Sequence, residues 1–234
     1  MKRIIVLLAT ASYIIRNDGF GAFTRRGIAF LRYQLFFHRS YYLHVTRLAV
    51  TNRTAEEPQI QDFSFKIITS NQQVKELTAE GFEFRPWYPV YSQRLDKGAT
   101  AFCGFDSKQL VHTSWCSFTG KAWKTLGEPP FKVDFSDNEA ATGDYWTDSA
   151  YRGKGLAHYA TVQREHYIRA NGRTLVRGSI ARDNQRAQRV SRFGTQHRYA
   201  EGRYLKILCW KSWRETPIVS QEEPVPSPNR LPQT

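Results

Sequence analysis

Apolar and polar residues alternate with a period of two along several segments in the first half of the chain. This period predicts strands, because successive side chains of a strand point to opposite faces of a sheet. The predicted strands lie at residues 63–69, 100–105 and 109–118. The last two are joined at Asp106-Ser107-Lys108 and predict a hairpin, and a short helix that ends at Gly81 is expected at residues 71–80.

Strand-like and helix-like segments alternate in the second half of the chain. The expected elements are, in order, a strand at 144–148, a helix over 156–168, a strand at 174–180, a helix from 181 to 194 and a strand at 203–210. Antiparallel strands followed by a βαβα portion predict an α/β (α+β) fold, in which a mixed, mostly antiparallel central sheet is flanked by helices.

Two glycines and two cations stand where the strand at 144–148 gives way to a helix. They form the run Arg152-Gly153-Lys154-Gly155. Glycine lets a backbone approach a phosphate without a Cβ in the way, and the first turn of a helix has free N–H donors and a partial positive charge. The run therefore suits a diphosphate, although an ordinary turn before a surface helix would also contain such residues.

The wider order of strand, glycine loop, helix, strand and Asn-led helix resembles the GNAT superfamily of N-acyltransferases. The positions that match its motifs are Arg152, Gly155, Ala157, Asn184, Ala187 and Gly194. The resemblance extends over about residues 60–214, and the specific motifs lie within 145–194. Many members carry a Tyr seven residues after the Asn as the acid that protonates the leaving thiolate, and this chain has Ser191 there.

The resemblance implies an acyl donor, acetyl-CoA, that inserts between a splayed pair of central strands. An N–H near Thr147 would polarise the thioester carbonyl, and Asn184 would bond the pantetheine arm. The donor-binding residues implied in this way are Trp146, Thr147, Arg152, Gly153, Lys154, Gly155, Leu156, Ala157 and Asn184.

A direct transfer to an amine needs a base for the ammonium proton and an acid for the thiolate. We expect Asp144 to be the base, with Asp148 on the same strand face and Glu139 upstream as alternatives, although a carboxylate here is also typical of a solvated surface charge or a cap. Tyr204 is the first candidate for the acid.

Two further residues, Tyr199 and Ser191, are alternatives for the acid. His112, on a predicted strand, is expected to be a core or surface histidine rather than a base. No metal is expected.

The composition is consistent with one folded domain that has an extension at each end. The 234 residues are 41% hydrophobic, which allows one sizeable core. We expect a basic, aromatic N-terminal extension at 1–58, a GNAT-like domain at 59–214 and a proline-rich, disordered tail at 215–234. The three cysteines, Cys103, Cys116 and Cys209, have no metal-ligand spacing and are interpreted as small buried side chains in a reducing compartment.

Two features of the N-terminal region concern location. The apolar run that follows Lys2-Arg3 and reaches Ile15 looks superficially like a secretory signal and is shorter than a membrane span. It is interpreted as a retained helix, and a cytoplasmic protein is expected, because the acyl donor that the resemblance implies is cytoplasmic. Residues 20–42 mix aromatic residues with arginines. Such a segment would lie on an anionic membrane surface, or its aromatic residues would pack on the domain while the arginines face water.

The net charge of +13 and the pI of about 9.8 indicate a polyanionic partner. Nucleic acid is not the partner expected, since part of the positive charge gathers near the proposed donor site; the cations there are Arg152, Lys154, Arg164, Arg186, Arg189 and Arg192. An acidic acyl carrier protein would also be attracted.

Three hypotheses follow. The first is an N-acetyltransferase acting on a primary amine of a small molecule. The second is an acyltransferase using a longer chain from acyl-CoA or acyl carrier protein. The third is a non-catalytic basic binding protein with a vestigial CoA site.

Overall fold

The computed structural model describes residues 11–12, 14–16, 18–48, 54–84, 89–127, 129–191 and 196–218. Its elements are, in chain order, α2 (Phe20–Leu35), β1 (Phe36–Arg47), β2 (Phe63–Ile68), α3 (Asn71–Ala79), α4 (Pro89–Asp96), β3 (Thr100–Asp106), β4 (Gln109–Ser117), α5 (Gly120–Trp123), β5 (Glu139–Thr147), the 3₁₀ turn η1 (Ser149–Tyr151), α6 (Leu156–Ala170), β6 (Leu175–Ala181), α7 (Gln185–Ser191), β7 (Gln196–Ile207) and β8 (Trp210–Pro217).

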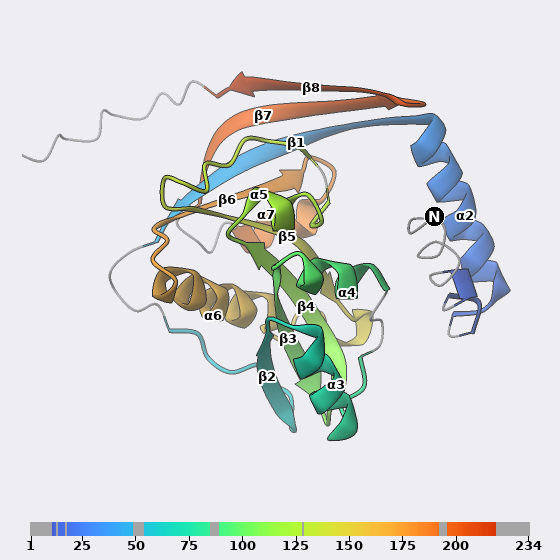
Figure 1. Cartoon of the computed structure of the whole chain (residues 1–234), viewed down its shortest axis with the longest axis vertical. Helices are drawn as coiled ribbons and strands as arrows, with labels where there is room; N and C mark the ends of the chain where they lie inside the picture. The colour runs from blue at the N-terminus through green and yellow to red at the C-terminus, as the bar shows by residue number, and fades with distance from the viewer. Residues whose placement is uncertain are drawn as a thin grey trace, which may run out of the picture.

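The strands form one eight-stranded sheet in the order β2-β3-β4-β5-β6-β1-β7-β8. Figure 1 shows this sheet running from β2 at the bottom of the view to β8 at the top. Neighbouring strands are antiparallel except β5 and β6, which are parallel. The mixed, mostly antiparallel sheet with flanking helices that the sequence predicts is confirmed.

Strand β1 corrects the predicted boundary of the N-terminal extension. Residues 1–58 are expected outside the domain, yet β1 lies inside the sheet, antiparallel to both β6 and β7. Leu43 is fully buried on one face of the sheet, and His44 and Thr46 are buried on the other face. A strand covered on both faces lacks the clean alternation of apolar and polar residues, which is why its sequence resembles a surface segment.

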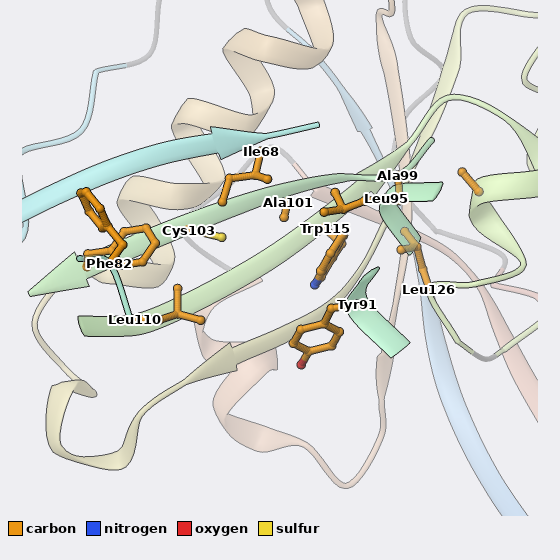
Figure 2. Close-up of a cluster of buried hydrophobic side chains, with 12 residues drawn as sticks. Ile68, Phe82, Tyr91, Leu95, Ala99, Ala101, Cys103, Leu110, Trp115 and Leu126 are labelled. Atoms are coloured by element: carbon orange, nitrogen blue, oxygen red, sulfur yellow. The ribbon is translucent and has the colours of Figure 1, made fainter. Parts of the chain in front are cut away.

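The two faces of the sheet have separate cores. Figure 2 shows the larger one, where Ile68, Ala101, Cys103 and Trp115 of the sheet meet Tyr91 and Leu95 of α4. Residues of α3 and α5 complete this face. The opposite face is covered by α6, whose Ile168 packs with Phe102, Cys116 and Val176.

Most local predictions in the first half of the chain are confirmed. Strand β2 and helix α3 begin and end within two residues of the expected bounds, and Ser70 caps α3 by accepting a hydrogen bond from the Gln73 N–H. The β3–β4 hairpin turns at Ser107 and Lys108, both at positive φ.

The C-terminal part of the sheet differs from the prediction. In place of one strand at 203–210, β7 and β8 form a hairpin that turns at Leu208, at φ 53°. The expected tail begins at residue 215, but β8 continues to Pro217, and residues 219–234 lie outside the described residues. Cys103 and Cys116 are buried as expected, whereas the prediction is wrong for Cys209, which is exposed.

Helix α2 leads directly into β1 and stands apart from the helices that cover the sheet (Figure 1). Of the helix expected before it, residues 11–12 and 14–15 are helical, and residues 1–10 lie outside the described part. Of the aromatic residues at 20–42, Tyr41 is buried in the core and Phe20 is 68% exposed. Within the described ranges no helix has the length and apolarity needed to cross a bilayer.

Candidate functional site

The parallel strands β5 and β6 pair over only three residues before they separate. The pairs run from Glu139 with Leu175 to Ala141 with Arg177. Beyond them a cavity of about 400 Å³ opens between the two strands. Its walls come from β5 (Thr142, Gly143, Asp144, Tyr145), β6 (Val176, Gly178, Ser179, Ile180, Ala181), β1 (Arg39, Tyr41, His44, Thr46), α6 (Ala157, Thr161, Arg164, Glu165) and α7 (Asn184, Ala187), with Trp123, Leu126 and Gln196.

A β-bulge interrupts β5 beside the cavity. Gly143 pairs with Trp115 and Trp146 pairs with Thr113, so two residues of β5 stand opposite one residue of β4. Asp144 adopts φ 48° within the bulge. A bulge bends its strand and redirects side chains, and here it helps β5 turn away from β6.

Asp144 lines the cavity but is already engaged. Its carboxylate forms an ion pair with the guanidinium of Arg94, which is 6% exposed. Arg94 also donates to the Thr125 carbonyl, at 3.1 Å, and stacks over the rings of Tyr91 and Trp115. To act as a base, Asp144 must accept a proton while it faces this fixed cation.

The glycine-containing turn lies at the start of α6, as predicted. Gly153 and Gly155 have φ of 83° and 84°, values that glycine adopts at little cost. Gly155 is the N-cap and provides no side-chain cap, and the first backbone bond of the helix runs from Tyr159 N–H to the Gly155 carbonyl at 3.0 Å. The N–H groups of Leu156, Ala157 and His158 come before the first N–H that bonds within the helix, so they can donate to an anion.

The cations of this turn are exposed and held locally. Arg152 Nε donates to the Thr147 carbonyl at 3.3 Å, and Lys154 Nζ lies 4.9 Å from the centre of the Tyr151 ring. Space beside the turn is open, since a Cβ on Gly153 would meet no atom within 4 Å. Leu156 itself is buried, so its side chain packs in the core and only its amide faces the turn.

Asn184 reaches the cavity from the other side, at the start of α7. Its Oδ1 accepts a hydrogen bond from the Ala187 N–H at 3.1 Å. This bond leaves the amide NH₂ as the group that can donate into the cavity. Among the predicted site residues, the structure thus brings Asp144, Ala157 and Asn184 to the walls of one cavity.

The side chains of three predicted residues lie elsewhere. Tyr204 is 1% exposed in the core between Phe37 and Trp213 and lines no part of the cavity, so it is not placed to protonate a thiolate there. Trp146 packs against the core on the α4 side of the sheet. The Thr147 hydroxyl bonds to Nδ1 of His112 at 2.8 Å.

The alternative acids and bases are also occupied. Glu139 is buried and accepts hydrogen bonds from Arg177 and from the Asp134 amide, both at 2.7 Å. Asp148 caps η1 through the Ala150 N–H. Tyr199 lies against the Arg177 guanidinium, and burial raises its pKa. The side chain of Ser191 lies outside the described residues.

His112 is a core residue, as expected. It is 1% exposed, and burial, together with the nearby charge of Arg164, lowers its pKa to about 3. A histidine in this state is neutral and has little affinity for a proton at neutral pH.

Two buried basic side chains of the cavity are not identified as site residues from the sequence. The sequence places Arg164 among the cations near the proposed donor site and His44 in the N-terminal extension, whereas the structure buries both, at 3% and 4% exposure. A signal for Arg164 exists in the sequence: it lies four residues from both Ala160 and Ile168 and so shares the apolar face of the helix. No comparable signal marks His44.

No family model and no curated protein matches the sequence. Several solved structures are similar. A Drosophila protein has a TM-score of 0.49 and 10% identity, covering 80% of this chain and 58% of that one. A GCN5-related N-acetyltransferase from Sphaerobacter thermophilus has a TM-score of 0.48 and 13% identity, covering 82% and 56%.

A third similar structure is a putative acetyltransferase of the GNAT family from Novosphingobium aromaticivorans. Its TM-score is 0.46 and its identity 14%, covering 71% of this chain and 63% of that one. The chain thus spans 56% to 63% of the length of these three proteins. At such identities and TM-scores the likeness identifies no substrate and no catalytic residue.

Proposed function

We propose that this protein is an N-acyltransferase that transfers an acetyl group from acetyl-CoA to a primary amine of a small molecule. The observation that carries the proposal is the separation of β5 from β6, which opens a cavity that the uncapped N-terminus of α6 borders through Ala157. An extended, phosphate-bearing thioester needs both features: a slot between strands and a cluster of free amides for its diphosphate.

The donor would be held by backbone more than by side chains. The amides from Gly153 to Ala157 would bind the diphosphate, with Arg152 and Lys154 adding charge at the exposed rim. The edge of β5 that does not pair with β6, around Trp146 and Thr147, would bond the pantetheine arm, and the Asn184 amide would contact it from the start of α7. Leu156 contributes its amide only, since its side chain is buried.

The reaction needs few catalytic groups. The amine nitrogen attacks the thioester carbonyl carbon, the C–S bond breaks, and the thiolate leaves while the nitrogen loses its proton. Most of the acceleration would come from holding the two reactants together and from an N–H that stabilises the oxyanion. Of the three predicted carboxylates, Asp144 is the one that lines the cavity. We propose that it accepts the ammonium proton, directly or through water.

Titration calorimetry with acetyl-CoA tests the donor site. We expect binding in the micromolar range, and no binding at high micromolar donor would contradict the proposal. A screen of an amine library for release of free thiol from acetyl-CoA then identifies the acceptor. In that assay Asp144→Asn should lower the rate of transfer and leave the affinity for acetyl-CoA within about twofold, because the base acts after the donor has bound.

A further inference from the structure

Arg164 has an unusual position for a charged side chain. It lies on the face of α6 that packs against the sheet, it is 3% exposed, and it lines the cavity between β5 and β6. Arginine is almost never buried to this extent unless an anion or a set of acceptors neutralises it.

The guanidinium of Arg164 lacks such neutralisation. In the part of the chain that the structure describes, its Nε and Nη1 have no hydrogen-bond partner. Nη2 has one long contact, at 3.5 Å to the Thr161 hydroxyl, and the ring of Tyr145 lies 4.7 Å from the guanidinium carbon. Two carboxylates line the cavity: Asp144 is paired with Arg94, and Glu165 forms no ion pair with Arg164 in the described part of the chain. Two nitrogens of a buried cation, Nε with one N–H and Nη1 with two, therefore lack acceptors among the described residues.

The donor diphosphate is not the missing anion. Arg164 follows Gly155 by nine residues. At 1.5 Å of rise per residue, its Cα lies about 13 Å further along the axis of α6. The guanidinium points back along the helix, but it contacts Thr161 and the Tyr145 ring rather than the turn that suits the phosphates. Arg164 therefore calls for a second anionic group, deeper in the cavity.

A second buried polar side chain lines the same cavity. His44 of β1 is 4% exposed, and neither ring nitrogen has a hydrogen-bond partner among the described residues. Burial and the charge of Arg198 lower its pKa to about 4, so the ring is neutral at neutral pH and offers one donor and one acceptor. The cavity thus combines an unneutralised cation with an unused neutral hydrogen-bonding group.

We propose that Arg164 binds a carboxylate of the reacting substrates, and that this enzyme is selective for an anionic small molecule. The proposal rests on the proposed function, since it takes the molecule in the cavity to be a reactant of the acyl transfer. The carboxylate comes either from the acyl group, as in a dicarboxylic acyl-CoA, or from the acceptor, as in an α-amino acid. A long apolar acyl chain does not fit a cavity that contains this charge.

Titration calorimetry distinguishes the two sources. In the first arm succinyl-CoA is compared with acetyl-CoA, and in the second, α-amino acids are compared with their neutral α-amides in the presence of saturating CoA. We expect one arm to show a preference of roughly 10- to 100-fold for the carboxylate, the strength of a charge-assisted pair. Arg164→Gln should reduce this preference to within about twofold, and Arg203→Gln, an exposed control on β7, should preserve it.

Two readouts separate failure of this proposal from failure of the proposed function. If acetyl-CoA binds but neither arm shows a preference, or the preference survives in Arg164→Gln, the carboxylate site is disproved and the acyltransferase proposal stands. If acetyl-CoA does not bind, a shift in melting temperature with succinate or amino acids in the wild type, absent in Arg164→Gln, still supports the site, and the lack of such a shift disproves it.

The ligand-free stability of Arg164→Gln provides an independent check. Removing a buried charge that lacks a partner should leave the melting temperature unchanged or raise it, because a residue kept for binding contributes little to the empty fold. A clear fall in melting temperature would assign Arg164 a structural role and overturn the proposal.

Discussion

The two halves of the sheet are built in different ways. From β2 to β5 the strands follow one another in the chain, and each pairs with the next. From β6 to β8 the order is broken, because β1 lies between β6 and β7 although more than 120 residues separate it from them in the sequence. The first half depends on local pairing and the second on a contact between distant parts of the chain.

The cavity lies at the seam between these halves. β5 supplies one wall and β6 the other, and β1 contributes His44 and Thr46. The N-terminal strand is therefore part of the candidate site as well as of the fold. A contact that forms between distant segments needs its interior residues to be well packed, because the chain loses entropy in closing the loop.

The largest expected effect concerns β1. Leu43→Ala should destabilise the protein by about 2–5 kcal/mol, and Ile68→Ala, in the other half, should fall in the same range, because both side chains are fully buried. Chemical denaturation followed by circular dichroism measures both. A loss under about 1 kcal/mol for Leu43→Ala alone would mean that β1 is an appendage and that the halves are not equivalent.

At the turn before α6, Gly155→Glu should weaken acetyl-CoA binding by about 100-fold or more, because a carboxylate would face the diphosphate next to the free amides. Gly172→Glu is the matched control: it lies after the other end of α6, at φ 74° and with open space beside it. Titration calorimetry should show unchanged affinity in the control. Equal affinity in the two variants would place the diphosphate elsewhere.

Acid should destabilise both sides of the seam. The pKa values of His44, in β1, and His112, in β4, are lowered by burial to about 4 and about 3. The unfolded chain binds these protons below about pH 6.5 and the folded chain does not, so stability is complete above pH 6.5 and falls as the pH drops toward 4.

The expected loss is about 2 kcal/mol for each histidine at pH 5 relative to pH 8. Denaturation midpoints measured at both pH values test it. His44→Gln and His112→Gln should each remove about half of the loss, and an unaltered pH dependence in either variant would contradict the lowered pKa of that histidine.

The smallest expected effect is that of Asn184→Ala on the β6 side. It should weaken acetyl-CoA binding by about 1 kcal/mol, or roughly fivefold, the contribution of one uncharged hydrogen bond. Because Asn184 also caps α7, Asn184→Ser serves as a control that keeps a capping oxygen. Equal weakening in both variants supports the role of the amide NH₂, and wild-type affinity in Asn184→Ala would remove Asn184 from the donor site.

The candidate site could be predicted in part. The turn at 153–155 and the positions of Ala157 and Asn184 follow from spacing, because a glycine turn, a helix start and a cap are set by residues close together in the chain. Tyr204 is a candidate acid on residue type alone, and nothing local to it reveals that Phe37 and Trp213 enclose it. Arg164 carries a local signal, its place on the apolar helix face, but its lack of a counter-ion depends on residues from other elements.

The sequence by itself determined the elements whose signals are local: the β3–β4 hairpin, helices α3 and α6, and the glycine turn between β5 and α6. Backbone preference and side-chain period act over a few residues, so a short stretch is enough to specify them. Only the tertiary structure decided the place of β1 in the sheet, the pairing of Asp144 with Arg94 and the isolation of Arg164. Each of these depends on which distant segment of the chain packs against the residue or strand in question. Whether a charge is buried or paired, and whether a strand is central or at an edge, is therefore fixed only when the chain has folded.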